Sequence, residues 1–190
     1  VETEDEREAV PWTHSPVPAE HQLRGMHAVR MWERELEPTE TLLTEVMGFE
    51  KVGVEGDWHR YAADGGGSGT FAEVKPLEPT VQRGRGGGTG GVHHAAWRVH
   101  DSEEEMALRE VLQKVGLQPT QQIDRFWFKS VYFREPGGVL FELATDGPGF
   151  TVDEDPDALG TSLVLPPSME DNRAEIEAAL PPLDTPQPAA

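Results

Sequence analysis

Hydrophobic and polar residues alternate along GMHAVRMW at positions 25–32, which is the pattern of a half-buried β-strand. A helical pattern follows at 38–47, where apolar residues recur every three to four positions and Gly48 suits the end of the helix. Three short strand-like runs then lie at 49–54, 58–62 and 70–74. This part of the chain therefore predicts one βαβββ unit.

The same order of elements is expected a second time. VHHAAWRV at 92–99 has the pattern of a strand, and a helix is expected to begin at Asp101 or Ser102 and to end at Gly116. Its apolar positions are Met106, Leu108, Val111, Leu112 and Val115. Strand-like runs follow at 121–126, 130–134 and 139–144. Because His94 follows His27 by 67 positions and Gly116 follows Gly48 by 68, the two units form a tandem repeat.

Each unit is too small to bury both faces of a sheet by itself. We therefore predict an α+β fold in which the two βαβββ units form a curved mixed sheet around a shared cleft. The module is expected to occupy residues 23–150, after an extended N-terminal arm at 1–22. A C-terminal extension at 151–190 is expected to carry a short helix at 168–179, capped by Ser168. The glycine-rich run 83–91 is interpreted as a flexible linker, and 184–190 as disordered.

The composition narrows the kinds of partner. There are 35 acidic against 16 basic residues, for a net charge of -19. Such a charge repels itself unless salt screens it, so we expect a halophilic, cytoplasmic protein, with an ordinary acidic protein as the alternative. Nucleic acid and membrane are not expected as partners, because the chain has no basic patch and no apolar run long enough to span a bilayer. The absence of cysteine excludes disulfides and thiolate metal sites.

Three residues point to metal chemistry. His27 and His94 hold matching places in the two units and are expected to face the same cleft. The alternation of side chains along a strand selects His94 over its neighbour His93. Glu142 lies in an otherwise apolar strand, where a carboxylate is costly unless it is paired or binds a metal. Two histidines and one carboxylate match the facial triad of non-haem Fe(II), so His27, His94 and Glu142 are the predicted ligands.

Several stretches resemble the ring-cleaving dioxygenases of the vicinal-oxygen-chelate superfamily, and most of all the hydroquinone-cleaving branch. They are GMHAVRMW, GVHHAAWRV, DRFWFKSVYFREPGGVLFELATD and LVLPP. The resemblance spans roughly residues 20–183 and implies the vicinal-oxygen-chelate fold. It also implies Fe(II), with Mn(II) as the alternative, held by the same three ligands, and a small aromatic diol and O₂ as substrates.

The resemblance further implies that His93, Arg125 and Tyr132 line the substrate site. We expect His93 to act as acid or base, Arg125 to offset negative charge, and Tyr132 to hydrogen-bond the substrate or oxygen. Enzymes of this branch usually carry two such modules, and the present sequence resembles the second of them. The module is therefore expected to pair with an N-terminal module, with a homodimer as the alternative.

Two other functions remain open on the sequence. A glyoxalase-like isomerase or lyase would need a fourth ligand from the last strand of the first unit, where Glu73 is the candidate. A non-enzymatic protein that sequesters small molecules in the same fold would bind no metal and would have a wide apolar cleft.

Overall fold

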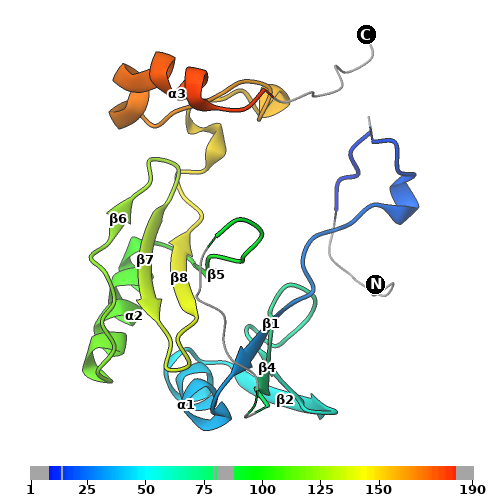
Figure 1. Cartoon of the computed structure of the whole chain (residues 1–190), viewed down its shortest axis with the longest axis vertical. Helices are drawn as coiled ribbons and strands as arrows, with labels where there is room; N and C mark the ends of the chain where they lie inside the picture. The colour runs from blue at the N-terminus through cyan, green and yellow to red at the C-terminus, as the bar shows by residue number, and fades with distance from the viewer. Residues whose placement is uncertain (1–8, 14, 79, 81–87, 183–190) are drawn as a thin grey trace.

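The computed structural model describes residues 9–13, 15–78, 80 and 88–182. The first unit forms a four-stranded sheet, sheet A, and the second forms a four-stranded sheet B (Figure 1). Sheet A has the order β1 (Ala28–Glu33), β4 (Phe71–Pro76), β3 (Trp58–Ala62), β2 (Glu50–Glu55). Sheet B has the order β5 (Ala95–Val99), β8 (Leu140–Thr145), β7 (Lys129–Arg134), β6 (Ile123–Asp124).

The two sheets repeat one topology. In each sheet the first and last strands of the unit are parallel, and the other neighbours are antiparallel. The predicted α+β class and the two tandem βαβββ units are thus confirmed, with the strands divided between two sheets. The predicted run 121–126 is shortened to the two residues of β6.

Each unit has one helix between its first and second strands. In the first unit α1 (Leu36–Thr41) continues as a π-helix at Leu42–Val46, and Gly48 after it has a φ of 75°. In the second unit α2 (Ser102–Lys114) is capped by Asp101, whose carboxylate accepts hydrogen bonds from two backbone amides. The predicted apolar stripe of α2 is partly wrong, because Val111 and Val115 are exposed while Glu105 and Arg109 are buried.

Each helix covers one face of its own sheet. The hydroxyl of Tyr61 in β3 donates to Glu40 of α1 over 2.6 Å, and Lys129 of β7 reaches Ser102 of α2. The opposite face of each sheet is called its open face here. On the open face of sheet A, Glu73 lies between Arg30 and Arg60. On the open face of sheet B, Glu142 lies between Ala96 and Tyr132.

One hydrophobic core joins the two units on the helix-covered faces. The ring of Trp97 in β5 lies 5.1 Å from that of Phe49, which follows α1, and 5.5 Å from that of Phe141 in β8. A polar contact adds to this junction, since the hydroxyl of Thr39 in α1 donates over 2.7 Å to Glu135 in the β7–β8 turn. Both Glu135 and Glu33 at the end of β1 are buried here.

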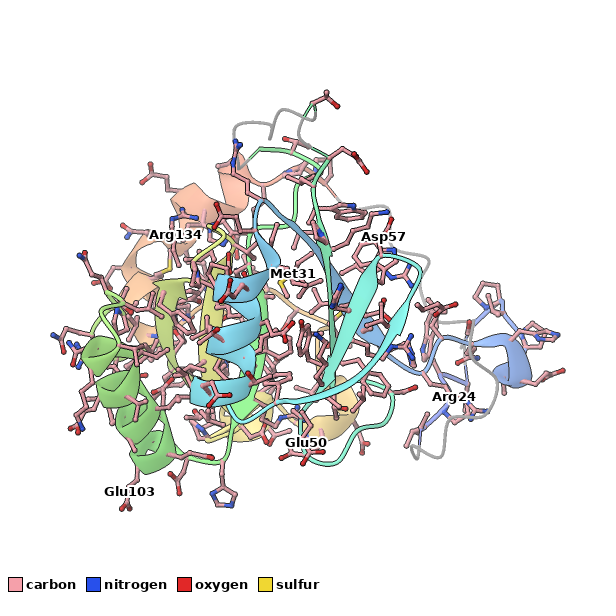
Figure 2. All side chains as sticks on the ribbon, turned by 90° about the horizontal axis from the view of Figure 1, so that it is seen from below. Arg24, Met31, Glu50, Asp57, Glu103 and Arg134 are labelled. Atoms are coloured by element: carbon pink, nitrogen blue, oxygen red, sulfur yellow. The ribbon has the colours of Figure 1, made fainter. Side chains whose placement is uncertain are left out.

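The segments before and after the two units are less buried than the units themselves. The arm that carries Arg24 extends away from both sheets and contains one 3₁₀ turn at Ala19–His21 (Figure 2). Among the described residues, no helix is both long and apolar enough to cross a membrane. Residues 1–8 of the predicted arm, 83–87 of the predicted linker and the predicted disordered end at 184–190 lie outside the described residues.

The C-terminal extension forms the expected helix in a different way. A 3₁₀ helix at Pro167–Asn172 precedes α3 (Arg173–Ala179), which lies beyond one end of sheet B (Figure 1). Ser168 therefore lies inside the first of these helices and does not cap it, which corrects the prediction. Arg173 holds the segment together by donating to the backbone oxygen of Leu163 and pairing with Glu170 and Glu177.

Candidate metal centre

His94 and Glu142 meet on the open face of sheet B. Nε2 of His94 lies 2.8 Å from Oε2 of Glu142, whose residue is only 4% exposed. His94 precedes Ala96 by two residues and so shares its side of the strand, and Ala96 pairs with Glu142 across the sheet. The second oxygen of this carboxylate, Oε1, is buried without a hydrogen-bond partner. A buried, unpartnered carboxylate oxygen is costly, and a bound cation would satisfy it.

The other predicted residues of sheet B are linked to His94 by a series of contacts. Nδ1 of His93 lies 2.8 Å from Nδ1 of His94, so one ring must donate to the other. The ring of Tyr132 stands edge-on to His94 with centroids 5.6 Å apart. The guanidinium of Arg125 lies 5.4 Å from the Tyr132 ring centre. The structure therefore brings together five of the six predicted site residues, His93, His94, Arg125, Tyr132 and Glu142.

His27 is not brought to this group. Its Nδ1 lies 2.7 Å from the hydroxyl of Ser68, and its ring lies 5.3 Å from that of Phe71, on sheet A. Over the described chain, no three histidine or acidic side chains are close enough together to hold a metal ion. His27 as the third ligand remains a prediction that this arrangement does not assemble.

The strand register explains why His27 and His94 are not equivalent. Arg30 pairs with Glu73 as Ala96 pairs with Glu142, so the position in β1 that corresponds to His94 is Ala28. Counting along the sequence misses this difference of one residue. In a strand, a shift of one residue moves a side chain to the opposite face.

Glu73, the candidate fourth ligand, is already engaged. It is buried, and it accepts hydrogen bonds from Nε of Arg30 over 2.5 Å and from Nε of Arg60 over 2.7 Å. Burial opposes the ionisation of Glu73, but the two arginines outweigh it and hold the pKa of this carboxyl below its ordinary value. Glu73 is thus an ionised carboxylate that two cations neutralise.

The sequence analysis missed two buried residues that interact with residues of the site. Ser130 is fully buried in β7, and its hydroxyl accepts a hydrogen bond from Nε of Arg125 over 3.3 Å. Ser130 could have been predicted from the sequence, because it lies two residues before Tyr132 and therefore on the same side of the strand. Glu105 of α2 is also fully buried, and burial raises its pKa, to which the negative charge of Glu142 adds. A glutamate on an amphipathic helix gave no such signal.

Comparison with known proteins shows the family to which the chain is related. The sequence pattern of the Glyoxalase/Bleomycin resistance protein/Dioxygenase superfamily matches residues 25–143. The chain is 40% identical over 177 residues to "Putative ring-cleaving dioxygenase MhqA" of Bacillus subtilis, which covers 92% of this chain and 56% of that protein. It is 32% identical over 177 residues to "Chlorohydroquinone/hydroquinone 1,2-dioxygenase" of Sphingobium indicum, which covers 93% of this chain and 55% of that protein.

A solved structure agrees with the sequence relatives. The crystal structure titled as a putative dioxygenase from Bacillus subtilis superposes with a TM-score of 0.85 at 37% identity, over 93% of this chain and 56% of that one. The present chain thus spans little more than half the length of the curated relatives it matches. These matches confirm the resemblance seen in the sequence motifs. The chain belongs to the glyoxalase, bleomycin resistance protein and dioxygenase superfamily, whose fold is the vicinal-oxygen-chelate fold.

Proposed function

We propose that this chain is the metal-binding module of a ring-cleaving dioxygenase that acts on hydroquinone- or catechol-like diols with non-haem Fe(II). Mn(II) is the alternative metal. The observation that carries the proposal is the pairing of His94 with Glu142, whose buried Oε1 lacks a partner. The names of the relatives, which describe ring-cleaving and hydroquinone dioxygenases, support the same reaction class.

The residues of the pair fit a divalent metal. A neutral imidazole nitrogen and a carboxylate are ligands that Fe(II) accepts, and His27 is the proposed third. When bound, Fe(II) would supply open coordination positions at which a diol oxygen and O₂ meet. His94 and Glu142, which now contact each other, would both turn to the ion and so satisfy the buried Oε1.

The contact between the two histidines couples the positions of their ring protons. If Nε2 of His94 is a ligand, its proton must lie on Nδ1, which then donates to Nδ1 of His93 over 2.8 Å. In that tautomer His93 carries its own proton on Nε2. His93 would therefore present this N–H to a substrate oxygen as a hydrogen-bond donor, while its acid or base role stays a prediction.

Arg125 and Tyr132 would stabilise negative charge near His94. The Arg125 side chain is held by Ser130 on one side and by the Tyr132 ring on the other, so its cation is fixed before substrate arrives. A fixed cation is effective at offsetting the charge of a phenolate or of reduced oxygen. The Tyr132 hydroxyl would add a hydrogen bond to the same oxygens.

The geometry argues against the glyoxalase-like alternative. That reaction class would need Glu73 as a fourth ligand, and Arg30 and Arg60 both bind this carboxylate. Freeing it would break two charge-assisted hydrogen bonds in a buried position. The three-ligand arrangement of an Fe(II) dioxygenase makes no such demand.

An anaerobic Fe(II) titration of the chain in about 2 M KCl tests the proposal, the salt being chosen to screen the acidic surface. We expect one tight equivalent, lost in His94→Ala and in His27→Ala but kept in His21→Ala, which changes a histidine of the arm. Normal binding by His27→Ala would remove His27 from the ligand set. No binding by the unaltered chain would contradict the proposal and favour a metal-free binding protein.

Oxygen uptake with hydroquinone and catechol then tests the reaction on the Fe(II)-loaded chain. His93→Ala should lower turnover and leave the metal content unchanged, because His93 is proposed to hydrogen-bond the substrate and not to bind the ion. Unchanged turnover in His93→Ala would remove this residue from the mechanism.

A further inference from the structure

A cavity of about 710 Å³ opens beside the two histidines of the candidate site. Its walls come from β1, from the end of β4 and the two residues after it, and from residues 92–95 before and at the start of β5. His93 and His94 line this cavity together with Arg30 and Trp32 of β1. A molecule in this cavity would therefore touch sheet A while it reaches the metal-binding side of sheet B.

The sheet A wall is aromatic. Trp32 is 49% exposed, and its ring stands edge-on to that of Trp58 at 4.9 Å. The guanidinium of Arg30 lies 4.8 Å from the centre of the same Trp58 ring, which holds the three side chains in one layer. An exposed indole on a fixed layer offers a planar ring a surface for stacking.

The same wall carries cations that carboxylates balance. Arg30 and Arg60 share the single carboxylate of Glu73, which leaves one net positive charge in this group of three. Lys75 also lines the cavity and pairs with the exposed Asp57, and Glu78 supplies a carboxylate at the same wall. The side chain of Arg30 is 53% exposed, so part of its guanidinium remains open to a ligand. The three cations and three carboxylates cancel, so in a protein with a net charge of -19 this wall is a neutral region where the half-exposed guanidinium of Arg30 can contact an anion.

We propose that this cavity binds the ring of a diol that carries a further anionic group, with the ring against Trp32 and the anion on Arg30. The diol oxygens then point toward His93 and His94. Arg30 and Trp32 thus determine specificity for carboxylated diols over neutral ones. This inference rests on the proposed function, since it places the substrate of that same site.

The test measures binding of 2,5-dihydroxybenzoate and of hydroquinone to the metal-free chain by calorimetry. The carboxylated diol should bind at least about tenfold more tightly, as expected for one charge-assisted hydrogen bond. Arg30→Gln should reduce this ratio to near one, and Trp32→Leu should weaken both ligands. Arg30→Lys should keep most of the preference, because it retains the charge and the pairing with Glu73.

Arg98→Gln is the matched control, since Arg98 is an exposed arginine of sheet B that pairs with Asp146 and does not line this cavity. It should leave the ratio unchanged. Equal affinity for the two diols, or a ratio unaffected by Arg30→Gln, would overturn the proposal, and so would no binding of either ligand. Oxygen uptake with hydroquinone by the Fe(II)-loaded chain separates this failure from failure of the proposed function, because the neutral diol makes no demand on Arg30.

Discussion

Glu73 and Glu142 occupy the same position in the two sheets. Each lies on the last strand of its unit, opposite one residue of the first strand and one of the third. Around Glu73 these neighbours are two arginines, whereas around Glu142 they are Ala96 and Tyr132. In sheet A two arginines neutralise this buried carboxylate. In sheet B the equivalent carboxylate has an unpartnered oxygen and lies beside a histidine.

Glu73→Gln should destabilise the chain by about 2 kcal/mol, less than for a fully buried ion pair because Arg30 is half exposed. The lowered pKa of Glu73 means that its stabilising effect is present above the unfolded pKa and is lost as pH falls through the folded pKa. Urea unfolding from pH 7 down to pH 3 should show a steeper loss for the unaltered chain than for the variant. Metal binding should survive the substitution, and its loss would revive the four-ligand alternative.

Most elements of the fold could be predicted because their apolar residues follow the period of a strand or a helix. β3 was predicted to the residue, and Asp101 was one of two expected caps for α2. The site was harder, since the strand register depends on pairing across the sheet. The spacing along the sequence placed His27 and His94 at equivalent positions, but the register of the strands shows that they differ by one residue.

The buried charged residues of α2 show a second limit of prediction from the sequence. Leu108 and Leu112 were placed correctly toward the core, but the neighbouring buried positions hold Glu105 and Arg109. Arg109 can be buried there because it donates to the backbone oxygen of Thr120 over 2.6 Å, and Glu105 accepts from Gln122. Such partners come from a loop whose path cannot be derived from helical periodicity.

Gly137→Ala should destabilise the junction between the two units. A Cβ at this position would overlap the carboxyl group of the buried Glu33 and crowd Glu135. Overpacking against buried side chains costs about 1–3 kcal/mol, and we expect the upper part of that range because both glutamates are buried. Chemical denaturation measures the change. Gly53→Ala in β2 is the control, as a Cβ there meets open space, and equal stability of the two variants would contradict the prediction.

Glu105→Gln should raise stability at neutral pH by about 1 kcal/mol, because it removes a charge from a fully buried carboxyl with one unpartnered oxygen. Burial raises the pKa of Glu105, so the stability that its protonated form contributes is complete below the unfolded pKa. That contribution is lost as pH rises through the folded pKa. Thermal unfolding at pH 4 and pH 8 should therefore separate the variant from the unaltered chain only at the higher pH. Glu110→Gln on the exposed side of α2 should change neither value, and a gain at both pH values would point to a cause other than ionisation.

Added KCl should stabilise the chain strongly. The net charge of -19 is spread over 190 residues, and in dilute buffer these charges repel one another across the surface of the fold. Because the screening length falls from about 10 Å at 0.1 M salt to about 3 Å at 1 M, the repulsion between neighbouring acids should largely vanish in molar KCl. We expect the thermal midpoint to rise by at least about 5 °C between 0.1 and 2 M KCl at pH 7, which corresponds to roughly 1–2 kcal/mol for a chain of this size.

An equal osmolarity of sucrose distinguishes screening of charges from the general stabilising effect of excluded solutes. A midpoint that stays constant or falls in KCl would show that the acidic surface is not an adaptation to salt, and the halophilic interpretation would then be abandoned.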